Sequence, residues 1–212
     1  MKNILKTILI LVLIISGSQL KAQTYRIEAG YIQPTRYSSV MSNRLFNGIR
    51  LGGTVDFNLP AEFLTIHTGL LYTYAFSTST QKALAGDSAI YKTQGHYIDV
   101  PLHLTASHWI LKKQVKLFAF AGPNFNIGLS QPQNVTTSAN YESVMGVEPG
   151  YSDLFKNDIQ RFNFQLEAGG GIQWRHFLVK GGYTFGINNL NRKNSDNKLH
   201  QSGWYVTAGY EF

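Results

Sequence analysis

The stretch from Leu64 to Phe76, LTIHTGLLYTYAF, alternates two kinds of side chain along the chain. Its even positions are Leu, Ile, Thr, Leu, Tyr, Tyr and Phe, whereas its odd positions include His67 and three threonine or alanine residues. A period of two is typical of a β-strand whose two faces meet different surroundings. This stretch therefore predicts a strand with one apolar and one polar face.

The same alternation recurs along the rest of the chain. We expect strands at residues 24–32, 48–58, 62–77, 97–107, 114–127, 161–175, 177–188 and 202–212. Short turns are expected at 58–61, 109–112 and 175–176, and long polar loops at 33–47, 78–96, 128–160 and 189–201. In an up-and-down meander, this order puts every short turn at one end and every long loop at the other, as in outer-membrane barrels. The predicted fold is all-β, a closed, antiparallel transmembrane β-barrel of eight strands.

The two faces of the expected strands differ in charge. Alternate residues of a strand point to the same face, and we call each such set of positions a parity. The apolar parity carries no charged residue, although 15% of the chain is charged. The opposite parity holds Arg26, Glu28, Arg50, Asp56, His67, Asp99, His103, Lys116, Gln165, Glu167, Gln173, Lys180 and Glu211. A soluble barrel buries its apolar parity, whereas a membrane barrel turns it outward and keeps the polar parity within.

The placement of aromatic residues favours the membrane arrangement. One group lies near the long-loop ends of the strands: Tyr72, Tyr74, Phe76, Phe162, Phe164, Tyr183, Phe185 and Trp204. A second group lies near the short-turn ends: Trp109, Trp174, Phe177, Tyr210 and Phe212. Two aromatic bands separated by aliphatic residues are expected where side chains sit at the two headgroup levels of a bilayer. The alternative is that these rings are strand formers in a soluble core.

The first residues predict export. Lys2 and Lys6 precede an apolar run from Ile8 to Ile15, which is followed by Ser16-Gly17-Ser18 and, at the expected cleavage site, Lys21-Ala22-Gln23. This is the layout of a secretory signal peptide, and the run is too short for a membrane helix of roughly 20 residues. We expect residues 1–22 to be cleaved and residues 23–212 to form one barrel domain in the outer membrane of a Gram-negative bacterium.

Composition excludes several classes of function. The chain has no cysteine, which excludes a disulfide framework and a lipoprotein anchor. Removing residues 1–22 takes away three lysines and no acid, so the net charge falls from +7 to +4. That modest charge, together with export, argues against a nucleic-acid partner.

The ionisable residues of the inner parity are expected to form a paired polar network that fills the lumen. Its predicted members are Arg50, Asp56, His67, Asp99, His103, Lys116, Glu167, Lys180 and Glu211. Unpaired charges in a narrow, poorly hydrated interior are costly. Asp99 and His103 lie about 13 Å apart on one strand, too far for joint metal ligation, although His67 can approach from a neighbouring strand. We expect no catalytic residue, cofactor or metal.

Several segments resemble one family. Four segments are similar to the PorT-like outer-membrane β-barrel family of Bacteroidetes: the strand Tyr97-Ile98-Asp99-Val100-Pro101-Leu102-His103-Leu104, the segment 118–124 with its Ala-Gly-Pro step, the Gly-rich strand 162–171 and the segment 182–189. The resemblance implies an outer-membrane barrel; one namesake is associated with protein secretion and gliding. The ending Ala208-Gly209-Tyr210-Glu211-Phe212 is similar to the closing strand of outer-membrane barrels. It implies that Tyr210 and Phe212 are a signal for the barrel-assembly machinery.

The leading functional hypothesis is a monomeric, non-enzymatic barrel with a structural, adhesive or envelope-organising role. Its partners would be outer-membrane lipid and a protein bound through the extracellular loops, with Tyr141, Met145, Tyr151 and Phe155 as contact candidates. Packing of these side chains against the barrel rim is the alternative. A narrow channel or an accessory part of a secretion system is the second hypothesis, and a barrel enzyme is the third.

Overall fold

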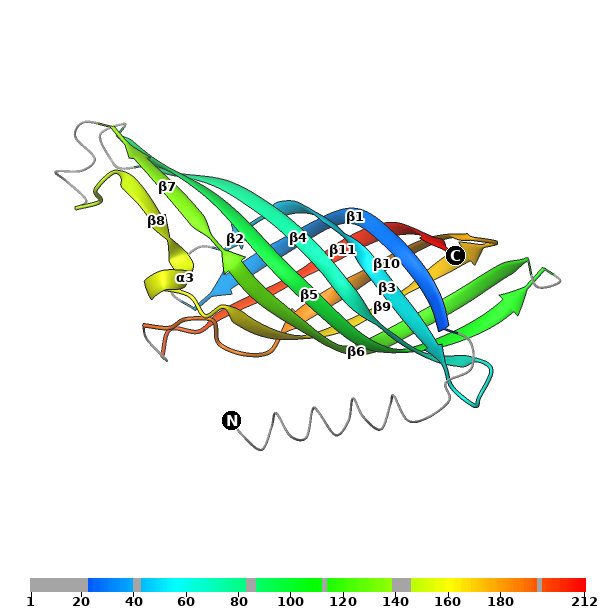
Figure 1. The fold of residues 1–212 in the computed structure, drawn as a ribbon. Helices are drawn as coiled ribbons and strands as arrows, with labels where there is room; N and C mark the ends of the chain where they lie inside the picture. Colours follow the sequence, from blue (N-terminus) through cyan, green and yellow to red (C-terminus); the bar gives the residue numbers. More distant parts are fainter. Residues whose placement is uncertain (1–22, 40–42, 83–86, 112–113, 139–145, 194–195) are drawn as a thin grey trace.

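The chain folds into a closed antiparallel barrel (Figure 1). The computed structural model describes residues 23–39, 43–82, 87–111, 114–138, 146–193 and 196–212. In these ranges, eight strands form the ring: β1 (Gln23–Ser38), β3 (Asn47–Asn58), β4 (Leu64–Lys82), β5 (Ser88–Ile110), β6 (Val115–Ser130), β9 (Phe162–Trp174), β10 (Phe177–Gly186) and β11 (Leu199–Glu211). Pairing of β1 with β11 and of β4 with β5 completes the circle. The predicted eight-stranded, up-and-down barrel is confirmed.

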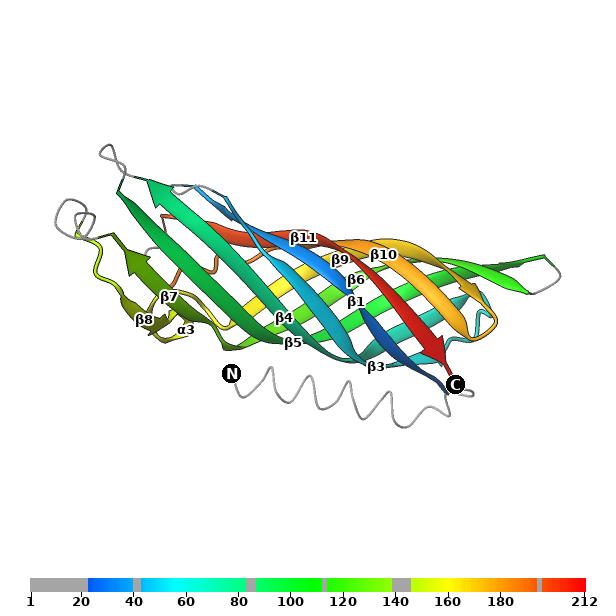
Figure 2. The same cartoon turned by 90° about the horizontal axis from the view of Figure 1, so that it is seen from above.

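The rim at the long-loop end has one tall side and one short side (Figures 1 and 2). On the tall side, where β4 and β5 extend upward, β7 (Pro132–Thr137) pairs with β5, and β8 (Gly150–Asp153) pairs with β7. The strand β2 (Arg44–Leu45) pairs with β1, and one helical turn, α3 (Leu154–Asn157), follows β8. β5 has 23 residues and β10 has 10, and about 9–11 residues suffice to cross a bilayer. The tall side therefore extends well beyond the length that a membrane requires.

The apolar parity faces outward and the charged parity faces inward. Leu70 is 59% exposed and Val179 is 49% exposed on the outer face, whereas Arg26 is 7% exposed and Asp99 is fully buried inside. Inside a closed ring, every strand pairs on both edges, so backbone donors and acceptors of the wall find partners within the sheet. The predicted orientation of the two faces is confirmed.

Two phenylalanines interrupt the polar inner face. Phe118 and Phe120 lie on the inner parity of β6, directly across from Gly171 and Gly169 of β9. A Cβ atom at Gly171 would come within 2.5 Å of Phe118 Cζ, and one at Gly169 within 2.6 Å of Phe120 Cζ. The glycines thus give the two rings space in a lumen that is barely wider than its own side chains.

The sheet is interrupted locally at Pro101, which has no N–H group to donate to the ladder. The pairing of β4 with β5 runs to Thr68 opposite Leu102 and resumes in the same register at Leu71 opposite Asp99. A shift of register occurs elsewhere, between His96 and Tyr97 along the β5–β6 pair. The break and the bulge are therefore separate features of β5.

Three of the predicted loops are largely regular structure. The segments 33–47 and 78–96 extend β1, β4 and β5, and the segment 128–160 contains β7, β8 and α3. The prediction was wrong there because it required apolar and polar residues to alternate. Above a bilayer both faces of a strand meet water, so a run such as TSTQK at 78–82 forms a strand without alternation.

The predicted signal peptide, 1–22, lies outside the described residues. Among the residues that the structure does describe, no helix is long and apolar enough to cross a membrane.

Candidate functional site

The lumen is the part of the molecule where polar chemistry is concentrated. The structure places all nine predicted network residues on the inner parity of the ring. Seven are buried: Arg50, Asp56, His67, Asp99, His103, Glu167 and Lys180. Lys116 and Glu211 are half-buried near the short-turn end of the barrel.

The layer nearest the short turns is built around Arg26 of β1. Its guanidinium nitrogens lie 2.7 Å from Asp56 Oδ2 and 2.6 Å from Glu211 Oε2. His67 Nδ1 lies 2.6 Å from the other oxygen of Asp56. Lys116 sits at the edge of this layer, with its Nζ 5.7 Å from the centre of the Trp109 ring. Because Arg26 and Glu211 belong to the first and last strands, this layer spans the seam that closes the barrel.

The next layer joins Glu28 of β1 to Lys180 of β10. Lys180 Nζ lies 2.7 Å from Glu28 Oε2, and Thr54 Oγ1 donates to Glu28 Oε1 at 3.2 Å. His67 connects this layer to the one below, since its Nε2 is 3.4 Å from Lys180 Nζ and 3.9 Å from Glu28 Oε1. The contacts of Lys180 with Glu28 and His67 join strands that are not neighbours in the ring, so they cross the lumen.

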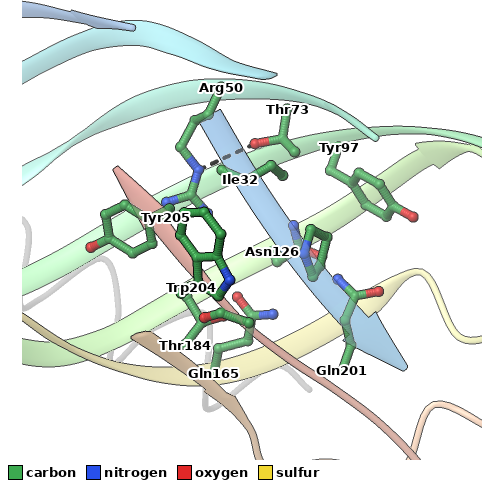
Figure 3. Close-up of a pocket in the computed structure, with 12 residues that line it drawn as sticks. Ile32, Arg50, Thr73, Tyr97, Asn126, Gln165, Thr184, Gln201, Trp204 and Tyr205 are labelled. Atoms are coloured by element: carbon green, nitrogen blue, oxygen red, sulfur yellow. Dashed lines mark hydrogen bonds between the residues drawn. The ribbon is translucent and has the colours of Figure 1, made fainter. Parts of the chain in front are cut away.

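Arg50 of β3 occupies the middle of the lumen (Figure 3). Its guanidinium lies 3.6 Å from Asp99 Oδ1 on β5 and 3.5 Å from Glu167 Oε1 on β9, and it packs over the Tyr205 ring at 4.9 Å. Arg50 Nε also donates to Thr73 Oγ1 at 3.3 Å, the dashed bond in the figure. One cation is therefore shared between two buried carboxylates on different strands.

Both of these carboxylates have further polar partners. Asp99 accepts hydrogen bonds from Thr73 Oγ1 at 2.6 Å, from Asn126 Nδ2 at 2.8 Å and from Asn124 Nδ2 at 3.0 Å. Glu167 Oε2 accepts from the Tyr205 hydroxyl at 3.2 Å and lies 3.1 Å from His103 Nε2. A buried charge is tolerated best when it is paired and its remaining lone pairs are hydrogen-bonded. Both oxygens of Asp99 accept hydrogen bonds, whereas Glu167 Oε1 has the Arg50 ion pair but no hydrogen bond.

A cavity of about 20 Å³ lies above Arg50. Its lining includes Arg50, Thr73, Tyr97, Asn126, Gln165 and Tyr205. That volume is room for about one water molecule. The size therefore suits a single water molecule rather than a small-molecule substrate, which needs several hundred Å³.

The uppermost polar layer surrounds Arg36 of β1. Arg36 Nη2 donates to Gln131 Oε1 at 2.8 Å and to the Tyr97 hydroxyl at 3.1 Å, and Nε donates to Gln201 Oε1 at 3.0 Å. Its guanidinium also packs over the Phe46 ring at 4.9 Å. Arg36 thus marks the transition from the polar lumen to an apolar cap.

The apolar cap closes the long-loop mouth of the barrel. It consists of buried side chains that come mostly from connecting segments: Ile32, Phe46, Ala75, Phe155, Ile159 and Leu190. Phe155 of α3 meets the Tyr97 ring edge-on at 6.1 Å between centroids. Asp153 orients α3, since Oδ1 accepts from the backbone N–H groups of Gln131 and Phe155, both at 3.0 Å. The segment after β8 therefore folds back over the lumen.

The loop residues predicted to contact a partner differ in their exposure to solvent. Phe155 is 3% exposed, so its prediction as a surface contact was wrong and the rim-packing alternative holds for it. Tyr151 on β8 is 76% exposed. Tyr141 and Met145 lie outside the described residues. The hydrophobic effect explains the position of Phe155, because the ring buries its surface in the mouth of the barrel.

Several members of the site were missing from the sequence prediction. Arg26 and Glu28 belong to the network, and their inner parity on β1 is the signal that points to them. Arg36, Gln131 and four of the cap residues, Phe46, Phe155, Ile159 and Leu190, lie in segments predicted as loops. No periodic pattern marks them, so sequence reasoning had no means of finding them.

The histidines lie together without forming a metal centre. His67 and His103 are opposite one another on β4 and β5, with ring centroids 5.8 Å apart, so the cross-strand approach does occur. Asp99 is separate from this pair and is held by Thr73 and two asparagines. In the described part of the chain, no group of three or more metal-ligating side chains is arranged to hold an ion.

The two C-terminal aromatic residues belong to one outward-facing cluster. Phe212 is 70% exposed and meets the Tyr210 ring at 5.2 Å, and Tyr210 in turn contacts Phe177 at 5.3 Å. This position leaves both rings accessible at the short-turn end. Recognition by assembly machinery stays a prediction.

An uncharged outer wall, a closed ring and an ion-paired interior define an integral membrane β-barrel. A family model described as "Outer membrane protein beta-barrel domain" matches residues 16–192, and the chain belongs to this family. The finer PorT-like resemblance stays a prediction. No match is found among curated proteins.

Solved structures with a similar fold are small outer-membrane proteins. Neisserial surface protein A aligns at a TM-score of 0.50 and 12% identity, covering 91% of this chain and 100% of that one. Ail, the attachment invasion locus protein of Yersinia pestis, gives a TM-score of 0.40 at 13% identity, covering 89% of this chain and 98% of its own. A major outer membrane protein from Thermus thermophilus gives 0.43 at 14% identity, covering 90% and 100%. At these identities the likeness concerns the fold alone.

Proposed function

We propose that this protein is a closed membrane scaffold in the outer membrane of a Gram-negative bacterium, and that it binds a protein partner through its tall extracellular side. Outer-membrane lipid surrounds the wall, and the scaffold works as a monomer without enzymatic chemistry. The supporting observation is the contrast between the filled lumen and the sheet that extends beyond the rim.

The filled lumen supports a scaffold rather than a channel. Five acids on the inner face, Glu28, Asp56, Asp99, Glu167 and Glu211, have basic side chains within 4 Å among the described residues. Above them, the apolar cap covers the mouth. An ion crossing this lumen would have to break several ion pairs and displace the cap, and each step is costly in a poorly hydrated interior. Discrete openings of the wild-type protein in planar bilayers would contradict the closed scaffold.

The tall side supports a contact surface. There β7 pairs with β5, and β8 pairs with β7, so the sheet continues beyond the ring. Its outermost strand, β8, carries the exposed Tyr151. Large exposed aromatic side chains on a polar background are characteristic of protein contacts, because they bury much area with few rotatable bonds.

Photo-crosslinking in cells tests this surface. We expect p-benzoylphenylalanine in place of Tyr151 to give a discrete protein adduct. The control is the same probe at Trp174, which is 54% exposed at the opposite end of the barrel. Identical adduct patterns from the two positions, or none from Tyr151, would overturn the proposal.

A trimmed variant then tests whether the extension is needed. Gln133 and Ser152 are directly paired, so residues 134–151 can be replaced by a two-residue Asn-Gly turn. This replacement keeps Asp153 and Phe155, and therefore the cap. We expect a folded barrel, judged by heat-modifiable gel mobility, that no longer captures the crosslinked partner. Undiminished capture would show that the partner binds elsewhere.

A further inference from the structure

The wall ends at different heights on the two sides of the barrel, and this places one group of charges near the membrane. On the short side, the last outward-facing residues of the wall are Phe162, Phe185 and Ile187, which are 48–49% exposed. Phe162 and Phe185 belong to the outer aromatic band, which sits at the headgroup level of a bilayer. The residues that precede Phe162 and those that follow Ile187 must therefore lie just above the lipid headgroups.

Those residues are rich in cations, and we name Lys156, Arg161, Arg192, Lys193 and Lys198 the short-side cluster. Two chain segments bring its members together. Ile159 and Asn191 form a β-bridge, and Gln160 N donates to Leu190 O at 2.8 Å. Arg192 Nη1 donates to Lys156 O at 3.2 Å. The backbone of Leu190 also bonds to that of Leu199, which draws Lys198 to the same rim.

The cluster carries an excess of positive charge. Among the described residues of these two segments the acids are Asp158, which pairs with Lys193, and Asp196. Lys156, Arg161, Arg192, Lys193 and Lys198 are all exposed at the rim. Arg161 donates to the carbonyl oxygens of Gly128 and Leu129, which holds its side chain against the barrel. Lysine side chains are flexible point charges, so they are the groups best able to contact a neighbouring molecule.

We propose that the short-side cluster binds the phosphate groups of the phosphorylated glycolipid that forms the outer leaflet. The outer wall supplies the complementary part of the site, because Phe162, Phe185 and Ile187 would contact the acyl chains directly below the cations. Cations at a membrane surface attract anionic headgroups, and a lysine or arginine with an aromatic residue beneath it matches the amphipathic shape of such a lipid. The inference depends on the barrel standing in an outer membrane, and it is independent of the contact surface on the tall side.

Binding of purified lipid A tests the proposal. The test variant is the double substitution Lys156→Gln and Lys193→Gln, which leaves both structural arginines in place. The matched control is Lys82→Gln with Lys92→Gln, which removes two exposed lysines from the tall side. Folding of all three proteins is checked by heat-modifiable gel mobility. Bound lipid A is counted by native mass spectrometry of the detergent-solubilised barrel during a titration.

We expect the test variant to bind lipid A roughly 25-fold more weakly than wild type, since each surface cation is worth about a factor of five. The tall-side control should stay within about two-fold of wild type. Dephosphorylated lipid A should bind the wild type as weakly as lipid A binds the test variant. Equal binding by all three proteins would overturn the site. Equal affinity of the wild type for phosphatidylglycerol would overturn its assignment to the glycolipid.

Discussion

The lower lumen and the mouth close the same barrel by opposite chemistry. In the lower lumen, charged side chains on the strands pair across the ring, as Arg26 does with Asp56 and Glu211. In the mouth, apolar side chains on connecting segments pack together, as Phe155 and Leu190 do. The charged part needs rigid strands, because a buried ion that misses its partner is costly. The apolar part tolerates attachment by loops, because the hydrophobic effect is not directional.

The comparison is tested most strongly by Arg50→Met. This substitution leaves Asp99 and Glu167 without their shared cation, and breaking a buried ion pair typically costs about 3–5 kcal/mol. We expect the free energy of unfolding to fall by that amount, measured by urea titration of the barrel in detergent micelles with tryptophan fluorescence.

A compensated variant sharpens this result. Adding Asp99→Asn and Glu167→Gln to Arg50→Met removes the orphaned charges, and most of the lost stability should return. If the triple variant were less stable than Arg50→Met alone, charge pairing would not be what holds the middle of the lumen together.

Phe155→Ala tests the mouth. The ring is 3% exposed, but α3 is a short segment that can open while the ring of strands stays intact. We therefore expect a smaller loss of global stability than for Arg50→Met, within the roughly 0.5–3 kcal/mol of an ordinary substitution. Limited proteolysis should cut the segment 146–160 much faster than in wild type. A loss as large as that of Arg50→Met would mean that the cap and the lower lumen unfold together.

Asp153→Ala tests how the cap is held in place. Its carboxylate accepts from the backbone of Phe155 and Gln131, and loss of an N-cap costs about 0.5–2 kcal/mol. The same proteolysis assay should show faster cleavage near α3, with Asp153→Asn close to wild type because asparagine also caps helices. Equal cleavage of the alanine and asparagine variants would argue against the capping role.

Lys193→Ala gives the smallest expected effect. Lys193 and Asp158 form an ion pair at the surface, and exposed pairs contribute about 0–1 kcal/mol. The midpoint of urea unfolding should shift little, and the shift should vanish in high salt. A loss above this range would show that the rim contributes to stability as the lumen does.

Much of the barrel wall could be predicted from the sequence. The alternation in segments such as 64–76 identifies the strands and assigns Leu70 to one face and His67 to the other, and the structure agrees. The same rule failed for residues 78–82 and 88–96, which belong to β4 and β5 although their apolar and polar residues do not alternate regularly. The alternation rule also gave no information on Phe155. This residue lies outside the strands, so its position in the sequence does not indicate which way its side chain points.

The sequence by itself determined the two faces of each strand and the set of charges that had to be enclosed. Side-chain direction in a strand follows from the local backbone, so it is readable over a few residues. Only the tertiary structure decided that Arg50 forms ion pairs with both Asp99 and Glu167, and that α3 packs into the mouth of the barrel. Those contacts join residues far apart in the chain. They depend on how the strands are staggered when the sheet closes, which no local pattern records.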